Sequence, residues 1–153
     1  MFLVILLKAF SNLSAKAKLR IWGALSQETA GLKGIADQFP QKVKEKIEWM
    51  GNYRNEDIVA EVFNKLDAIV VPSIWGENSP LVIHEAEQLR IPVITANYGG
   101  MAEYVQDGIN GLLFKHRDVE SLSEKMENLS INKKLYTKLS QKGYLYSNDS
   151  NVP

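Results

Sequence analysis

The sequence contains no cysteine and only two histidines, His84 and His116, among its 153 residues. The absence of cysteine excludes disulfides, thiol catalysis and cysteine-ligated metal centres. The two histidines lie far apart in the chain and lack the spacing of metal ligands, so we expect no metal site.

Neither sign of charge is in surplus, because 18 lysines and arginines balance 18 aspartates and glutamates. This balance gives no argument for a nucleic-acid partner or for an acidic solvating tail. The apolar run 1–7 is too short to span a bilayer and lacks the flanks of a signal peptide. We therefore expect a cytoplasmic protein with one domain over residues 1–146 and a disordered tail over 147–153.

Short apolar segments alternate with helical patterns along the chain. Predicted strands cover 19–23, 47–50, 67–72, 91–96 and 112–114, and predicted helices cover 1–13, 27–39, 40–46, 55–65, 80–89, 101–105, 119–129 and 133–144. Asn55 is the expected cap of helix 55–65, and strand 67–72 is apolar as if covered on both faces. The alternation predicts an α/β fold, a Rossmann-like parallel sheet with helices on both faces. Ligands of such folds bind outside the carboxyl ends of the strands.

Two carboxylates, Glu77 and Glu85, lie on either side of a helix start at Ser79-Pro80. The first-turn amides of Leu81 to Ile83 and the helix dipole favour an anion such as a diphosphate. Carboxylates near a phosphate would repel it, but they accept hydrogen bonds from hydroxyl groups. A ligand with phosphate in its middle and hydroxyls at both ends satisfies all these groups, so the pattern indicates a nucleotide sugar.

The flanking segments make the pattern more specific. In order they are Val71-Pro72-Ser73, the Glu-x7-Glu span 77–85, Pro92-Val93-Ile94, the Gly-Gly-x-x-Glu turn 99–103 and the Asp-Gly-x-Asn-Gly-Leu-Leu segment 107–113. Together they resemble the donor-binding region of the retaining glycosyltransferases of family 4, which have the two-domain GT-B architecture. The resemblance implies the C-terminal, Rossmann-like domain of such an enzyme.

The resemblance also implies roles for individual residues. Glu77 would contact hydroxyls of the transferred sugar and stabilise positive charge at its anomeric carbon, which makes it the catalytic candidate. Glu85 would bind the ribose, backbone amides would hold the diphosphate, and the glycine pair would allow close backbone approach. The candidate substrate-binding residues are Glu77, Asn78, Ser79, Pro80, Leu81, Val82, Glu85, Gly99 and Gly100. The implied donor substrate is a nucleotide-diphosphate sugar, with no cofactor.

The chain departs from the family at its start. The family's domain opens with a strand ending in Gly-Arg and a loop with Lys-Gly, whose cations neutralise the diphosphate, whereas residues 1–10 match the helix after that loop. We therefore expect a truncated domain that lacks the first strand and the N-terminal acceptor-binding domain and is inactive alone. Peripheral membrane association of the full enzyme stays open. The alternatives are a stand-alone, non-catalytic nucleotide-sugar-binding module and another GT-B enzyme, such as a nucleotide-sugar epimerase.

We expect no ligand-binding role for four further polar residues near these motifs. We expect His84 to pack against its neighbours and His116 to be solvated. Glu87, where the family favours a small residue, is interpreted as surface variation. Glu103 is interpreted as a first-turn charge that the helix dipole favours.

Overall fold

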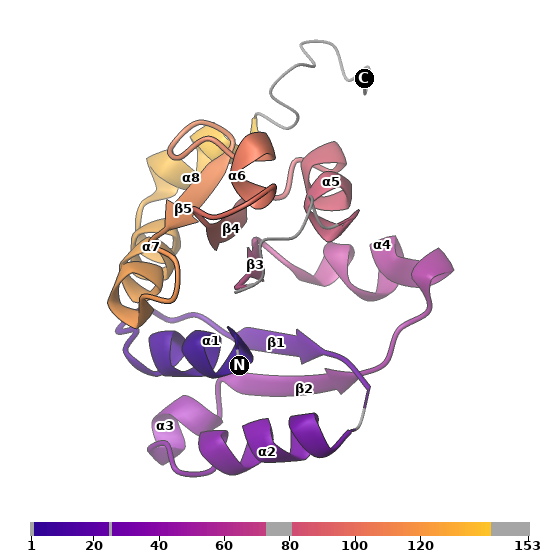
Figure 1. The fold of residues 1–153 in the computed structure, drawn as a ribbon, viewed down its shortest axis with the longest axis vertical. Helices are drawn as coiled ribbons and strands as arrows, with labels where there is room; N and C mark the ends of the chain where they lie inside the picture. Colours follow the sequence, from indigo (N-terminus) through magenta and orange to yellow (C-terminus); the bar gives the residue numbers. More distant parts are fainter. Residues whose placement is uncertain (1, 25, 73–80, 142–153) are drawn as a thin grey trace.

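The computed structural model describes residues 2–24, 26–72 and 81–141, and the account below concerns these ranges (Figure 1). The elements follow in the order α1 (Phe2–Ser11), β1 (Leu19–Trp22), α2 (Gln27–Ala36), α3 (Gln41–Lys44), β2 (Ile47–Gly51), the 3₁₀ turn η1 (Asn55–Asp57), α4 (Ile58–Glu61), the 3₁₀ turn η2 (Phe63–Lys65), β3 (Ile69–Val71), α5 (Leu81–Gln88), β4 (Val93–Ala96), α6 (Met101–Tyr104), β5 (Gly111–Phe114), α7 (Val119–Ile131) and α8 (Lys133–Ser140). Most predicted elements are present, with ends that differ by a few residues. The expected tail over 147–153 lies outside the described residues.

Side-chain caps explain where several helices begin. Ser26, Asp118 and Asn132 each accept a hydrogen bond from a backbone N–H three residues on, at the starts of α2, α7 and α8. Each cap satisfies one of the first-turn donors that have no partner inside the helix. Asn132 also ends α7, so one residue sets the corner between the two C-terminal helices of the described chain.

All strand pairs named here are parallel, as the alternation of strands and helices predicts. The described strands form two sheets, however, rather than one continuous sheet: β1 pairs with β2, and β4 lies between β3 and β5. Figure 1 shows the two sheets in separate layers, with α2 and α3 beside β1–β2 and the helices α5 to α8 around β3–β5.

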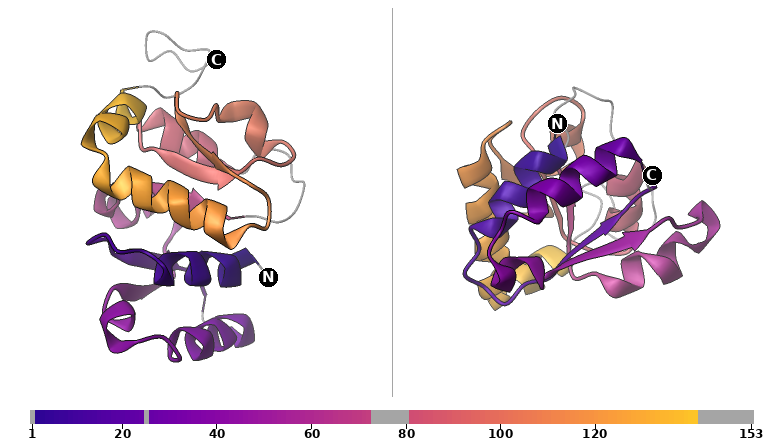
Figure 2. Two further views of the ribbon diagram at one scale, coloured as in Figure 1. Left: turned by 90° about the vertical axis from the view of Figure 1, so that its left-hand side faces the viewer. Right: turned by 90° about the horizontal axis from the view of Figure 1, so that it is seen from below.

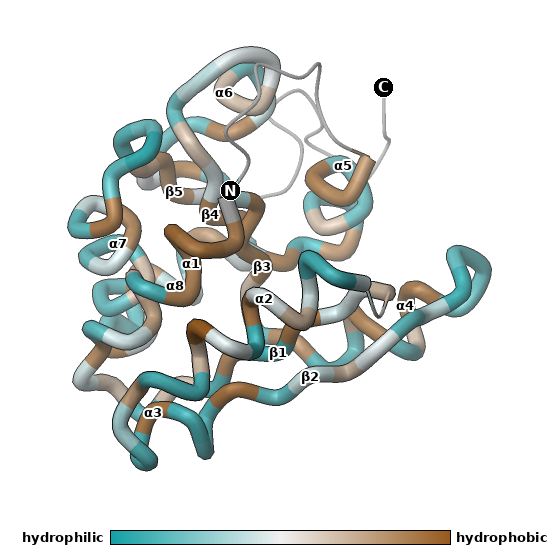
Figure 3. The backbone as a smooth tube through the Cα atoms, turned by 60° about the horizontal axis from the view of Figure 1, so that its bottom comes forward, coloured by the Kyte–Doolittle hydropathy of each residue, from teal (hydrophilic) through white to brown (hydrophobic). Residues whose placement is uncertain are grey.

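Helix α1 joins the two layers. It contacts α7 of the larger layer and α2 of the smaller one, and it lies between them in the side view of Figure 2. Its residues Leu7 and Ala9 are fully buried, and Figure 3 shows α1 as one of the strongly hydrophobic segments of the chain. Within the expected buried run, residues 3–5 are half-buried and Leu6 and Leu7 are buried in α1.

Strand β4 is the most enclosed strand of the described chain, because all four of its residues are buried. Helices α5 and α6 contact β4, and α7 contacts β5. By contrast, all three residues of β3 are only half-buried, so the expectation that segment 67–72 is covered on both faces was wrong. The physical reason is that β3 pairs only with β4 and leaves its other edge unpaired in the described chain.

The segment 55–65 was also predicted incorrectly as one amphipathic helix. It consists of η1, α4 and η2, and the backbone leaves helical geometry at Val62, where φ is −118° and ψ is −69°. Its β-branched residues Ile58, Val59 and Val62 are stiff and weak helix formers, and Val62 and Phe63 are both buried by the irregular turn. Asn55 begins η1 after Arg54 and makes no side-chain cap.

Gly111, the first residue of β5, lies close both to the backbone of β4 and to the side chain of Val105. A Cβ atom placed there would lie 2.5 Å from the carbonyl oxygen of Val93 and 2.7 Å from Cγ1 of Val105. Since Val93 is paired with Gly111 in the sheet, the obstacle is ladder backbone, which cannot move without disturbing β4. This close approach explains why glycine occupies the position.

We predict that Gly111→Ala destabilises the fold by roughly 1–3 kcal/mol, the usual cost of overpacking a core. Gly31→Ala is the matched control, because Gly31 lies inside α2 with nothing within 4 Å of the added Cβ. The control should stabilise the protein by roughly 0.5–1 kcal/mol. Urea denaturation of both variants measures the difference, and equal stabilities would contradict the steric account.

Candidate functional site

The candidate site lies at the carboxyl ends of the parallel strands β3, β4 and β5, which is called the sheet edge below. Their parallel register brings Val71, Ala96 and Phe114 to one edge of the sheet. The buried Thr95 hydroxyl donates to the Val71 carbonyl at 3.0 Å, and the backbone N–H of Asn97 donates to the Phe114 carbonyl at 2.9 Å. These bonds fix the loop that leaves β4, so groups on that loop are held in place before any ligand arrives.

The structure places part of the predicted site at this edge. Leu81 begins α5 with 78% of its surface exposed, while Val82 and Glu85 are half-buried, and Glu85 lies one turn further along. The other four candidates, Glu77, Asn78, Ser79 and Pro80, lie outside the described residues.

The predicted glycine pair follows β4. Gly99 has φ +62°, a left-handed conformation that favours glycine, and Gly100 directly precedes α6. Glu103 is exposed in the first turn of α6, where a carboxylate interacts favourably with the helix dipole. The loop therefore turns sharply at the sheet edge and leads at once into a helix.

Two helices that flank the site are in contact through aromatic rings. His84 of α5 meets Tyr104 of α6 edge-on, with ring centroids 4.5 Å apart and an interplanar angle of 72°. The expectation that His84 packs against its neighbours is confirmed. Because Glu85 is the next residue, this contact helps to set the rotation of α5.

A buried carboxyl, Glu87, makes a second link between α5 and the rest of the site. Its Oε1 accepts a hydrogen bond from Nδ2 of Asn110 at 3.3 Å, its Oε2 is buried without a hydrogen-bond partner, and its surface is 3% exposed. Burial raises the pKa of Glu87 to about 8, since a low-dielectric site disfavours the charged form. The interpretation of Glu87 as surface variation was wrong, because the sequence alone does not show that Asn110, 23 residues further on, is its hydrogen-bond partner.

Asn110 is the centre of this link. Its side chain donates to the Tyr104 carbonyl at 2.8 Å and accepts from the Gln106 N–H at 2.8 Å, in addition to the Glu87 bond. Asp107 of the same turn accepts from the Leu113 N–H at 2.8 Å. In the described structure, the Asp-Gly-x-Asn-Gly segment thus builds the turn between α6 and β5. Its Asp-Gly and Asn-Gly pairs are the sequence signals that predict such a turn.

A stacked pair of rings stands at the same edge of the sheet. Tyr98, after β4, and His116, after β5, lie 4.0 Å apart between ring centroids with an interplanar angle of 15°. His116 is half-buried and its Nδ1 atom is buried without a hydrogen-bond partner, so the expectation of a solvated His116 was wrong. Adjacent parallel strands bring the two rings together, a pairing that sequence separation conceals.

Within the described ranges, no group of three or more histidines, aspartates and glutamates is arranged to hold a metal ion. The same part of the chain contains no helix that is both long and apolar enough to cross a membrane.

Comparison with known proteins decides the family. The model of the glycosyl transferases group 1 family matches residues 3–146. The chain belongs to this family. Among curated relatives, the D-inositol 3-phosphate glycosyltransferase of Mycobacterium marinum is 30% identical over 99 residues, which cover 65% of this chain and 20% of that protein. An uncharacterized glycosyltransferase of Methanocaldococcus jannaschii is 36% identical over 101 residues, which cover 66% of this chain and 28% of that protein.

Solved structures confirm the expected α/β fold class of GT-B glycosyltransferases. Sucrose-phosphate synthase from Thermosynechococcus elongatus superposes with a TM-score of 0.80 at 20% identity, covering 92% of this chain and 35% of that one. Anabaena Alr3699/HepE in complex with UDP-glucose superposes with a TM-score of 0.77 at 20% identity, and the match covers 91% of this chain and 38% of HepE. The C-terminal domain of a glycosyl transferase group 1 family protein from Francisella tularensis, LpcC, superposes with a TM-score of 0.77 at 21% identity. The match covers 92% of this chain and 74% of the LpcC domain. This group 1 chain spans 20% and 28% of the length of these two curated relatives.

We predict that Glu87 makes the stability of this group 1 domain depend on pH. A carboxyl whose pKa rises on folding from 4.5 to about 8 stabilises the fold fully below pH 4.5, and this contribution is lost as pH rises toward 8. The slope should reach up to about 1.4 kcal/mol per pH unit. Glu87→Gln keeps an acceptor for Asn110 and cannot ionise, so its stability should be flatter between pH 5 and 8.

Urea denaturation at pH 5, 6.5 and 8 tests this prediction. Glu124→Gln is the control, because Glu124 is an exposed carboxylate on α7, and it should retain the wild-type pH dependence. Parallel curves for the wild type and Glu87→Gln would show that Glu87 does not carry the effect.

Proposed function

We propose that this chain is the nucleotide-diphosphate-sugar-binding domain of a retaining, family-4 glycosyltransferase that acts in glycan or polysaccharide synthesis. The observation that carries the proposal is that the start of α5 and the β4–α6 loop both lie at the carboxyl ends of the strands. Leu81 opens α5, Glu85 lies one turn further on, and the left-handed Gly99 turns the neighbouring loop. The family membership of residues 3–146 supports the transferase class.

The physical basis for nucleotide binding is the combination of a helix start with an oxygen acceptor. The amino end of α5 presents backbone N–H groups and the positive end of the helix dipole, which suit a diphosphate. Glu85 has no N–H or O–H to offer when ionised, so it suits the two hydroxyls of a ribose. Its half-buried position shields such bonds from water and so strengthens them.

The proposed reaction exchanges one bond at the anomeric carbon of the donor sugar. The bond from this carbon to the diphosphate oxygen breaks, and a bond to the acceptor hydroxyl oxygen forms on the same face of the ring. The hydroxyl proton passes to the departing diphosphate. We assign Glu77 to the sugar hydroxyls and to the positive charge that develops at the anomeric carbon, and Glu85 to the ribose. No cofactor enters this scheme.

The similarity to longer enzymes supports the proposal that the complete enzyme has two domains. HepE was solved with UDP-glucose, a nucleotide-diphosphate sugar, and this chain covers 38% of it. We propose that the acceptor is bound by an N-terminal domain of the complete enzyme, because a donor-binding edge alone gives the acceptor hydroxyl no fixed approach to the sugar.

We predict that Glu85→Ala weakens nucleotide binding roughly 10- to 100-fold, since a hydrogen bond to a charged group is worth about 1.5–3 kcal/mol. Titration calorimetry with UDP, GDP and ADP measures the affinity, and ligand-observed NMR extends it to weak binding. Glu103→Ala is the matched control, because it removes an exposed carboxylate from the neighbouring α6. Equal affinity of wild type and Glu85→Ala would overturn the ribose assignment.

We predict further that the purified 153-residue chain transfers no sugar, whichever of UDP-, GDP- and ADP-glucose is offered with a sugar acceptor. Release of the nucleoside diphosphate, followed by chromatography, is the measurement, and robust turnover would refute the prediction. Tight nucleotide binding without turnover would favour the stand-alone binding module over a half-site.

A further inference from the structure

Glu87 of α5 is a buried carboxyl that uses only part of its hydrogen-bonding capacity. Its surface is 3% exposed, its Oε1 accepts from Asn110 at 3.3 Å, and its Oε2 is buried without a hydrogen-bond partner. A buried polar atom without a partner costs free energy, which an unbranched apolar side chain of similar length would avoid. Stability therefore does not account for a glutamate at this position, whereas a directed hydrogen bond does.

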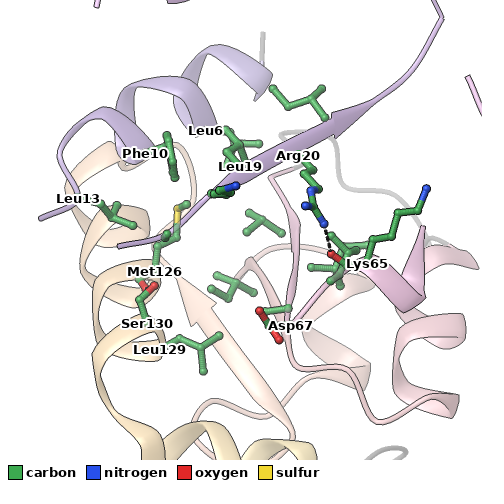
Figure 4. Close-up of a pocket in the computed structure, with 18 of the residues that line it drawn as sticks. Leu6, Phe10, Leu13, Leu19, Arg20, Lys65, Asp67, Met126, Leu129 and Ser130 are labelled. Atoms are coloured by element: carbon green, nitrogen blue, oxygen red, sulfur yellow. Dashed lines mark hydrogen bonds between the residues drawn. The ribbon is translucent and has the colours of Figure 1, made fainter. Parts of the chain in front are cut away.

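Helix α5 is held differently on its two sides. Ile83 and Ala86 are fully buried and face the core. On one side of them, Val82 borders a cavity of about 900 Å³, which Figure 4 shows with Leu6 of α1 and Met126 of α7 among its lining residues. An open space offers few packing contacts, so packing restrains α5 only weakly on the Val82 side.

The opposite side of α5 is attached to α6 at two points. His84 and Glu87 are three residues apart and are therefore neighbours on the helix surface. The His84 ring meets the Tyr104 ring edge-on at 4.5 Å. Glu87 bonds to Asn110, which also donates to the Tyr104 carbonyl at 2.8 Å. Two attachments one turn apart fix the rotation of a helix about its axis, and both of these lead to Tyr104 at the end of α6.

Glu85 lies on the weakly packed side of α5. It is half-buried and three residues after Val82, so these two side chains are neighbours on the helix surface. Because the cavity offers little restraint there, the direction of the Glu85 carboxylate follows the rotation that His84 and Glu87 set. The same attachment fixes α5 relative to the glycine pair that leads into α6.

We infer that Glu87, through Asn110, is a positioning residue that orients Glu85 for ligand binding. The inference rests on the proposed nucleotide binding and adds the group that directs its ribose acceptor. Glu87 is itself buried, so it acts through the rotation of α5 rather than through contact with the ligand.

Two substitutions of Glu87 separate orientation from stability. Glu87→Met keeps an unbranched side chain of similar length but removes the acceptor for Asn110, whereas Glu87→Gln keeps an acceptor oxygen. Titration calorimetry at pH 6.5 with UDP, GDP and ADP measures the affinity, and urea denaturation measures the stability. Glu87→Met should bind roughly tenfold more weakly while being at least as stable as the wild type, and Glu87→Gln should retain the wild-type affinity. A merely structural role would lower stability and affinity together.

A measurement without ligand tests the attachment directly. The chain has two histidines, His84 and His116, so the imidazole signals of its proton NMR spectrum report on each of them. Glu87→Met should shift the His84 signal, because the ring then moves relative to the Tyr104 ring beside it. His116, which stacks on Tyr98, is the internal reference and should keep its signal. Glu87→Gln should leave both signals in place.

Glu124→Met is the matched control, because it makes the same change at an exposed carboxylate of α7. It should alter neither the nucleotide affinity nor the His84 signal. Unchanged affinity or an unchanged His84 signal in Glu87→Met would overturn the inference, as would an equal loss of affinity in Glu124→Met. Failure of the wild type to bind any of the three nucleotides would overturn the proposed function instead, and the His84 signal would then still decide whether Glu87 sets the position of α5.

Discussion

The arrangement of this domain depends on the enclosure of β4. Each of its residues is buried, and its backbone pairs with β3 on one side and β5 on the other. A strand in this position can hold only side chains that pack, and Thr95 fits because its hydroxyl bonds to the Val71 carbonyl. The enclosure aligns the ends of three strands, and the candidate ligand groups of α5 and of the β4–α6 loop then meet at one edge.

Much of this could be predicted from the sequence, because the relevant signals are local. Apolar runs of strand length, helical periodicity and turn glycines identify most elements between Leu19 and Ser140. The helix start before Glu85 and the glycine at position 99 are equally local, since a cap, a dipole and a left-handed turn each involve a few adjacent residues. These local features predict a helix and a glycine turn after two successive strands, and in the structure α5 and Gly99 follow β3 and β4.

The features that could not be predicted depend on distant partners. Glu87 is buried on α5, where its partner Asn110 comes from the turn after α6, and His116 is half-buried because β5 brings it beside Tyr98. Residues 55–65 have helical periodicity, but tertiary packing of Val62 and Phe63 breaks the helix. Strand β3 is likewise only half-buried, and one of its edges is unpaired within the described chain. In each case, burial and pairing across the fold override what the local pattern favours.

The division into two sheets also has a consequence for how the native state fluctuates. The unit of β1, α2, α3 and β2 is attached to the rest through α1, a hydrogen bond from Arg20 to the Lys65 carbonyl and two chain connections, and no strand ladder joins the two sheets among the described residues. Since cooperative units open at free energies set by the contacts that hold them, we expect this unit to open at a lower free energy than the β3–β5 layer.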